Sequence, residues 1–271
     1  MNGDFLTQMA QASRGRVNAA REMASDATLM VRALATPPPV MLQLSDQGFD
    51  LIAEVKLRSP AVGALKPATE DLAARVESYA TAGAAAVSIL TEPSHFDGTL
   101  AHLELGVRAL GGRIPAMRKD FLVDPYQVME ARIAGAGGVL VILRMLNARE
   151  IDALLDCAGR LDLFVLLEAF DAADIEIAHR LVAQRRGEEL LVGVNCRDLQ
   201  TLQVVPGRLE ALGNLLPDSV PRVAESGVAN ADDARRMVAA GYDLALVGSA
   251  LMTSEDPSRL LRELLAAGRG A

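Results

Sequence analysis

Residues 51–56 read Leu-Ile-Ala-Glu-Val-Lys, an apolar run that closes on two charged residues. Short runs of this kind recur along the chain and are apolar almost throughout. A continuous apolar run, rather than an alternating one, is typical of a strand in a parallel sheet that is buried on both faces. We predict eight such strands: Leu51–Lys56, Ala86–Leu90, Ile114–Lys119, Gly138–Leu143, Phe164–Glu168, Leu191–Asn195, Arg222–Glu225 and Leu244–Val247.

The stretches between these runs carry helix signals. Asn230 is a suitable N-cap for a helix that continues through Met237, and Thr69–Val76 carries acidic residues where a first helical turn is expected. Glycines that can end a helix in the left-handed conformation stand before several strands: Gly83, Gly135, Gly187 and Gly241.

Eight strands with one helix between each pair predict an α/β fold, the (β/α)₈ or TIM barrel. The length of 271 residues suits one such barrel. A doubly wound open sheet is the main alternative, but that fold usually has fewer strands and one dominant ligand crevice.

The first part of the chain has a different pattern. Apolar residues recur at roughly helical spacing from Phe5 to Leu34, and Pro37–Pro39 cannot continue a helix. We therefore predict an N-terminal helical extension and linker over residues 1–45, and a single catalytic barrel over residues 46–271.

Composition excludes several classes of function. The net charge is −8, and the basic residues are dispersed, which makes the chain a poor nucleic-acid binder. We expect no membrane interaction, because no apolar run approaches the length of a membrane span. Cys157 and Cys196 form no C-x-x-C motif, so we expect reduced thiols, no metal site and a cytoplasmic protein. The acidic surface and the extension favour a monomer.

Six of the eight predicted strands end in polar or charged residues. Because side chains alternate along a strand, Glu54 and Lys56 point to the same side. An acid and an amine that face a barrel interior are costly unless they are functional. In such barrels the active site lies at the carboxyl ends of the strands. The other polar endings are Arg118–Asp120, Glu168, Asn195–Asp198, Glu225–Gly227 and Gly248–Ser249.

The last two strand endings indicate a phosphate site. Gly227 and the Gly248-Ser249 pair are each expected to open the next helix, where backbone N–H groups bind anions and glycine allows close approach. Barrels often bind phosphate with the loops after strands seven and eight. An ordinary turn followed by an N-cap is the alternative.

These motifs, in this order, carry a resemblance to a known family. The segments are Glu54–Pro60 with Gly63, Leu90–Glu92, Arg118–Phe121 with Asp124–Gln127, Asn195–Leu199, Ala224–Gly227 and Val247–Met252. With them the chain resembles the indole-3-glycerol phosphate synthase family over about residues 51–252, and its N-terminal extension is similar to the family's.

The resemblance implies a reaction and its catalytic residues. The substrate would be 1-(2-carboxyphenylamino)-1-deoxyribulose 5-phosphate, which undergoes ring closure, decarboxylation and dehydration without a cofactor, in tryptophan biosynthesis. Lys119 would be the cationic acid for ring closure, and Lys56 and Glu54 the acid and base of dehydration. Glu168 would stabilise the cationic intermediate or share the proton transfers, and Asn195 would hold the site's geometry.

The resemblance also implies the binding residues. Ser59, Arg197 and Glu225 would contact the substrate, Phe96, Phe121, Leu140 and Ile142 would hold its aromatic ring, and Ser226, Gly227, Gly248 and Ser249 would hold its phosphate. Other enzymes of tryptophan biosynthesis are possible partners.

The chain departs from the family at several positions. Leu57 stands where a basic residue is common, Ala61-Val62 replace a more polar pair, Cys196 replaces Asn or Ser, and Gly137-Gly138 lack the usual Asp. The alternatives are therefore a related barrel with an altered substrate, such as an isomerase of phosphoribosyl compounds, and a non-catalytic barrel that binds a sugar phosphate. Whether the N-terminal helix closes over the site also stays open.

Overall fold

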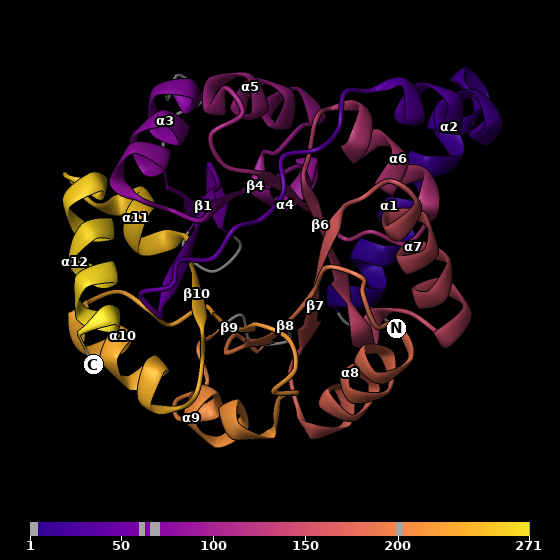
Figure 1. Cartoon of the computed structure of the whole chain (residues 1–271). Helices are drawn as coiled ribbons and strands as arrows, with labels where there is room; N and C mark the ends of the chain where they lie inside the picture. The colour runs from indigo at the N-terminus through magenta and orange to yellow at the C-terminus, as the bar shows by residue number, and fades with distance from the viewer. Residues whose placement is uncertain (1–4, 60–62, 66–70, 199–202, 271) are drawn as a thin grey trace.

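Eight parallel strands close into a barrel in the structure, a computed structural model that describes residues 5–59, 63–65, 71–198 and 203–270 (Figure 1). Strands that are neighbours in the chain pair with one another, and β1 also pairs with β10 to close the ring. The strands are β1 (Asp50–Val55), β4 (Ala86–Leu90), β5 (Ala116–Lys119), β6 (Gly138–Ile142), β7 (Phe164–Ala169), β8 (Leu190–Asn195), β9 (Arg222–Glu225) and β10 (Leu244–Val247).

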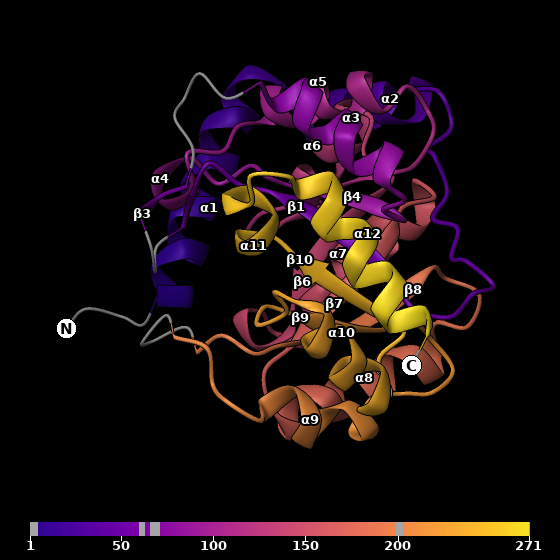
Figure 2. The same cartoon turned by 90° about the vertical axis from the view of Figure 1, so that its left-hand side faces the viewer.

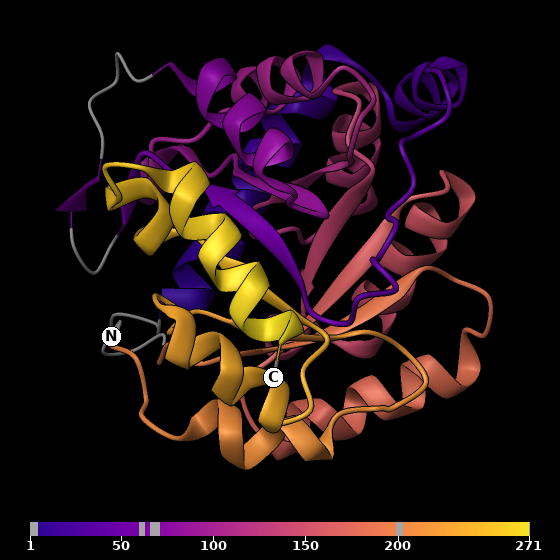
Figure 3. The same cartoon turned by 60° about the vertical axis from the view of Figure 1, so that its left-hand side comes forward.

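A ring of helices covers the outside of the barrel, one after each strand. The yellow C-terminal helix α12 lies across the outer face near β1 (Figure 3). The outer helices are α3 (Leu72–Ala82), α5 (Leu100–Leu110), α6 (Pro125–Ile133), α7 (Ala148–Arg160), α8 (Ala172–Gln184), α9 (Arg208–Leu212), α10 (Ala231–Ala239) and α12 (Pro257–Arg269).

The eight predicted strands and the barrel are confirmed, with small shifts at the ends. β5 begins at Ala116 rather than Ile114, because Pro115 has no N–H to donate to a sheet, although its carbonyl accepts from Val87 N at 3.0 Å. Leu143 lies outside β6, in the 3₁₀ helix η1 (Leu143–Met145). The four glycines predicted to end helices, Gly83, Gly135, Gly187 and Gly241, all have positive φ.

Two predictions about helix starts need correction. Gly227 does not open a helix: α10 begins at Ala231, and Asn230 caps it as predicted, with Asp233 closing a capping box. Asp71 does not lie in a first turn but is itself the N-cap of α3. Thr69 and Glu70 lie outside the described residues.

The N-terminal extension contains two helices, α1 (Phe5–Met23) and α2 (Asp26–Ala35). Ser25 separates them and accepts from Thr28 N, so it caps α2. As predicted, helix ends before the prolines, and Arg132 of α6 holds the chain there by donating to Thr36 O at 3.0 Å. The division of the chain at residue 45 stays a prediction.

The linker after α2 and the ring of Phe164 explain why Gly137-Gly138 stand where the family usually has an Asp. A Cβ on Gly137 would lie 2.4 Å from Val40 O, so the linker passes too close for any side chain. A Cβ on Gly138 would lie 2.3 Å from the Phe164 ring. Glycine at both positions is therefore required by packing.

Further short elements gather at one end of the barrel, on the side where Figure 2 shows the N-terminus of α1. They are the antiparallel pair β2 (Arg58–Ser59) and β3 (Gly63–Ala64), with α4 (Pro93–Phe96) and α11 (Ser249–Thr253), while η2 (Gly213–Leu215) follows α9. The sequence did not predict the β2–β3 pair. None of the helices in the described ranges is long and apolar enough to cross a membrane.

Candidate active site

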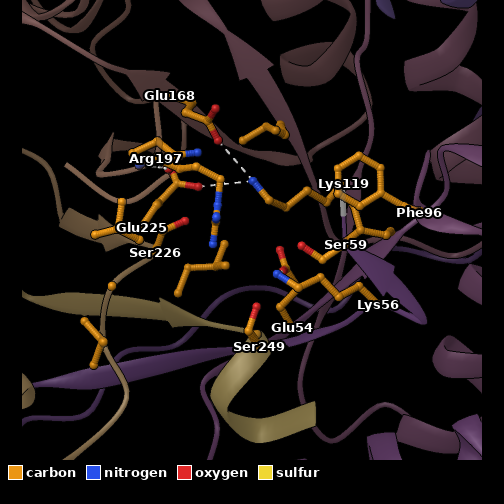
Figure 4. Close-up of a pocket in the computed structure, with 18 of the residues that line it drawn as sticks. Glu54, Lys56, Ser59, Phe96, Lys119, Glu168, Arg197, Glu225, Ser226 and Ser249 are labelled. Carbon is orange, nitrogen blue, oxygen red and sulfur yellow. Dashed lines mark hydrogen bonds and ion pairs between the residues drawn. The ribbon is translucent and has the colours of Figure 1, made fainter. Parts of the chain in front are cut away.

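A cavity of about 300 Å³ opens at the carboxyl ends of the strands (Figure 4). That volume is at the lower end of the range for small-molecule sites. All of the site residues predicted from the sequence line it: Glu54, Lys56, Ser59, Phe96, Lys119, Phe121, Leu140, Ile142, Glu168, Asn195, Arg197, Glu225, Ser226, Gly227, Gly248 and Ser249. Their roles in binding and catalysis remain predictions.

Lys119 lines the cavity and forms two ion pairs. Its Nζ is 3.0 Å from Glu168 Oε2 and 3.2 Å from Glu225 Oε2, with both carboxylates almost fully buried. These three residues stand at the ends of β5, β7 and β9, and alternate strands of such a barrel point side chains into the same layer. Figure 4 shows the ammonium directed between the two carboxylates.

A second ion pair comes from β1. Lys56 Nζ donates to Glu54 Oε1 at 2.7 Å, which confirms that the two side chains share one side of the strand. Gly248 lies against this pair, because a Cβ there would be 2.3 Å from Glu54 Oε1 and 3.0 Å from Lys56 Nζ. The loop after β10 can approach the pair this closely only with glycine.

The charges shift the proton affinities of these groups in different directions. Burial opposes the charge of Lys119, but Glu168, Glu225 and Glu54 outweigh it and raise its pKa above the usual value. Burial would also raise the pKa of Glu54, yet Lys56, Lys119 and Arg197 bring it below its usual value. At neutral pH Lys119 therefore carries its proton and Glu54 is ionised.

Glu225 behaves differently. Burial and the nearby Glu168 charge raise its pKa well above the usual value, although Lys119 opposes them. Among the described atoms, its buried Oε1 has no hydrogen-bond partner. A Cβ on Gly193 would come within 2.4 Å of this oxygen, so glycine makes the room for it. Glu225 thus holds a proton more readily than an ordinary carboxyl does.

The loops after β8, β9 and β10 form another wall of the cavity. Asn195 Oδ1 accepts from Arg197 N at 2.9 Å, which fixes the turn after β8. Ser226 and Gly227 both have positive φ, 68° and 78°. The Gly248-Ser249 pair opens a helix, as predicted: Gly248 is the N-cap of α11 and Ser249 its first residue.

The remaining wall is apolar and aromatic. The rings of Phe96 and Phe121 lie 6.2 Å apart, and Leu140 and Ile142 of β6 are buried beside the cavity. Phe5 of α1 packs edge-on against Phe121 at 5.7 Å between centroids. These residues suit one face of a flat aromatic group.

Some lining residues were not predicted. Phe5 is the most informative, because the chain has only 6 Phe and its position on an amphipathic helix gave no sign of the site. Asp120 lay within a quoted motif but was given no role. The others are mostly apolar: Leu90, Val204, Val228, Ala229, Leu246 and Ala250.

The other departures from the family pattern are at Cys196, Leu57 and Ala61-Val62. Cys196 is buried beside the site, donates from Sγ to Val205 O at 3.1 Å, and has its pKa raised by burial. Leu57 is buried. Ala61 and Val62 lie outside the described residues. Within the described ranges no group of three or more His, Cys, Asp or Glu is placed to hold a metal ion.

A family model described as indole-3-glycerol phosphate synthase matches residues 6–264 of the chain. The chain belongs to this family. Proteins named indole-3-glycerol phosphate synthase are similar over almost the whole length: that of Mycolicibacterium smegmatis is 38% identical over 265 residues, covering 97% of this chain and 94% of the relative. The Mycobacterium ulcerans protein is 37% identical with the same coverage. That of Kineococcus radiotolerans is 41% identical over 222 residues, covering 82% and 78%.

A solved structure supports the barrel independently. Thiamine phosphate pyrophosphorylase from Pyrococcus furiosus superposes with a TM-score of 0.60 at 19% identity, covering 82% of this chain and 96% of that one. An identity this low bears on the fold alone, so membership of the indole-3-glycerol phosphate synthase family rests on the family model and the relatives.

Proposed function

We propose that this protein is an indole-3-glycerol phosphate synthase, a decarboxylating carbon–carbon lyase of tryptophan biosynthesis that acts on 1-(2-carboxyphenylamino)-1-deoxyribulose 5-phosphate. The observation that carries the proposal is the pair of charge clusters in one cavity. Lys119 lies between Glu168 and Glu225, and the Glu54–Lys56 pair stands at the end of β1 in the same cavity.

Ring closure is the step that needs a cationic acid. The ring carbon that bears the carboxylate attacks the ribulose carbonyl carbon, and the electrons of the C=O bond move to oxygen. Lys119 supplies the proton to that oxygen, because its raised pKa keeps the ammonium charged in a buried position. Glu168 balances the charge of Lys119 and of the cationic intermediate.

Decarboxylation then restores the aromatic ring. The bond from the ring carbon to the carboxylate breaks, its electron pair returns to the ring, and carbon dioxide leaves. Lys56 attracts the carboxylate before this step. No oxidant or reductant is consumed, so the side chains of the cavity can account for the chemistry.

Dehydration completes the indole. The hydroxyl formed in ring closure departs as water with a proton from Lys56, and Glu54 removes a proton from the neighbouring ring carbon. The lowered pKa of Glu54 suits a base that is ionised before substrate binds. Glu225 lines the same cavity, and its raised pKa favours a protonated carboxyl in contact with the substrate.

Binding uses the remaining walls. Phe96, Phe121, Leu140 and Ile142 hold the anthranilate ring, while Asn195, Arg197 and Ser59 hold the sugar chain. The phosphate lies on the loops after β9 and β10, against Ser226, Gly227, Gly248 and Ser249, where glycine backbones allow close approach. We also expect a cytoplasmic monomer.

Indole formation tests the proposal. The purified chain is mixed with the carboxyphenylamino-deoxyribulose phosphate, and the indole product is followed by its absorbance and fluorescence. We expect turnover, and much weaker turnover of the substrate without its phosphate. Binding of the substrate without product would instead support a non-catalytic barrel, and failure to bind it would support an altered substrate.

A further inference from the structure

Helix α1 crosses the catalytic end of the barrel and bonds to the chain segment that directly follows Lys119. Ser13 of α1 is fully buried and donates from its Oγ to Phe121 O. Arg16, one turn further on, donates from Nη2 to Asp120 Oδ1 at 2.7 Å. Residues more than a hundred positions apart in the sequence therefore share one polar cluster.

Asp120 is the centre of this cluster. Its carboxylate is fully buried and accepts from Thr91 Oγ1 at 2.8 Å, from Arg118 Nη2 at 3.1 Å and from the backbone N–H of Phe121 at 2.8 Å. The bond to the Phe121 N–H fixes the peptide that joins Asp120 to Phe121. Asp120 thus holds in place the backbone on which Lys119 stands.

Gln127 closes the cluster from the other side. Its Nε2 donates to Ser13 Oγ at 3.0 Å, and its Oε1 accepts from Val123 N at 2.8 Å. Arg16 also donates to Ser13 Oγ, at 2.9 Å. The segment from Asp120 to Val123 is therefore bonded at both ends, and α1 takes part at each.

We propose that Arg16 is a positioning residue for the reaction. Acting through Asp120, it fixes the backbone next to Lys119, so that α1 is a fixed wall of the active site and not a lid that must open in each turnover. This inference rests on the proposed function. A misplacement of a catalytic group by about 1 Å can cost about a hundredfold in rate.

Arg16 is suited to positioning more than to stabilising the fold. Its side chain is 30% exposed, so its charge stays partly hydrated although its partner Asp120 is fully buried. When Arg16 is removed, Asp120 keeps its bond to Arg118. Buried Glu92, whose Oε1 lies 3.7 Å from Arg16 Nη1, keeps its bonds from the backbone N–H groups of Ser94 and His95. The cost of losing Arg16 should therefore appear in the rate.

Arg16→Ala tests the inference, with Arg14→Ala as the matched control. Arg14 lies on the same helix, but its partner is Glu150, at 2.8 Å, outside the cavity. For Arg16→Ala we expect kcat to fall about tenfold to a hundredfold, KM to change less than about threefold, and the thermal midpoint to stay near that of Arg14→Ala. KM changes little because Phe5 and Phe96 still hold the Phe121 ring.

The conservative variant sharpens the test. Arg16→Lys can pair with Asp120 but offers one ammonium in place of the two bonds that Arg16 makes, so we expect kcat between wild type and Arg16→Ala. A purely structural role would lower the midpoint and the active fraction but leave kcat per folded molecule unchanged. An unchanged kcat in Arg16→Ala would overturn the proposal.

Amide exchange measures the same coupling without catalysis. In Arg16→Ala we expect the Phe121 N–H to exchange at least about tenfold faster than in wild type, with no change in Arg14→Ala. Faster exchange in a protein that forms no indole would support the positioning role while the proposed function fails. An unchanged exchange rate, with or without lost activity, would overturn the positioning role.

Discussion

The two ends of the barrel interior are built on the same strands and yet differ in charge. The lower end, at the amino ends of the strands, is apolar, whereas the upper end, at their carboxyl ends, holds the ion pairs. On β5, Met117 points into the barrel one pleat below Lys119, and on β9 Val223 stands one pleat below Glu225. The lower positions form a closed apolar cluster, and the upper ones hold charges within 3.2 Å of one another. A shift of two residues along a strand thus separates packing from chemistry.

The lower end of the barrel interior contributes mainly to stability, and the upper end mainly to the reaction. Aliphatic and aromatic side chains at the lower end gain free energy from burial. Buried charges at the upper end lose their hydration, and replacing such groups by apolar ones is often neutral or stabilising. Substitutions at the lower end should therefore change stability with little effect on the rate, and those at the upper end should do the reverse.

Phe164→Ala at the lower end is expected to have the largest effect on stability. Its ring is buried and packs against the space left by Gly138, so its removal leaves a cavity that costs about 3–5 kcal/mol. Urea unfolding measures the loss. Activity per folded molecule should stay near wild type, and a much larger loss of activity would show that the two ends are not separate.

Gly248→Ala at the upper end should act mainly on the rate. The new Cβ would press on Glu54 Oε1 and Lys56 Nζ, and overpacking of this kind costs about 1–3 kcal/mol. We expect indole formation to slow by at least about tenfold as the pair is displaced. Steady-state kinetics at neutral pH measures this, and a wild-type rate would mean that the close approach is unnecessary.

Glu225→Gln should stabilise the fold at neutral pH while impairing the reaction, because glutamine has no charge to bury. The raised pKa of Glu225 means that the folded state binds its proton more tightly than the unfolded chain does. Wild-type stability therefore falls as pH rises above the ordinary carboxyl pKa, and the variant escapes that loss. The thermal midpoints of wild type and Glu225→Gln should diverge as the pH rises from about 4, near the ordinary carboxyl pKa, to about 8. Midpoints that change in parallel would contradict the raised pKa of Glu225.

Gly15→Ala is expected to have the smallest effect. Gly15 lies on the exposed face of α1, and a Cβ there meets nothing within 4 Å. Alanine in a helix is favoured over glycine by about 0.5–1 kcal/mol, so stability should rise slightly at an unchanged rate. Thermal unfolding measures the change in stability, and indole formation is assayed beside Gly248→Ala. A loss of activity in both variants would point to a general effect of added methyl groups.

The sequence predicted the upper end of the barrel well for a physical reason. Strand periodicity identifies which residues end each run, and closure of the barrel brings those ends together. The meeting of Lys119, Glu168 and Glu225 therefore follows from the sequence without coordinates.

The contributions of α1 could not be predicted in this way. Phe5 lines the cavity, and Ser13 and Arg16 bond to the segment after Lys119. All three do so because a helix docks against loops far along the chain, and helical periodicity does not identify a docking partner. The start of α10 was misplaced because the turn at Ser226-Gly227 delays it.

The rate of indole formation by Lys119→Ala at saturating substrate tests the central claim most directly. Removing one preorganised proton donor costs about 2.7–4 kcal/mol of transition-state stabilisation, or about a hundredfold to a thousandfold in rate. We predict a loss of this size in protein that is still folded and still binds substrate. A rate equal to that of wild type would contradict the assignment of Lys119 as the acid for ring closure.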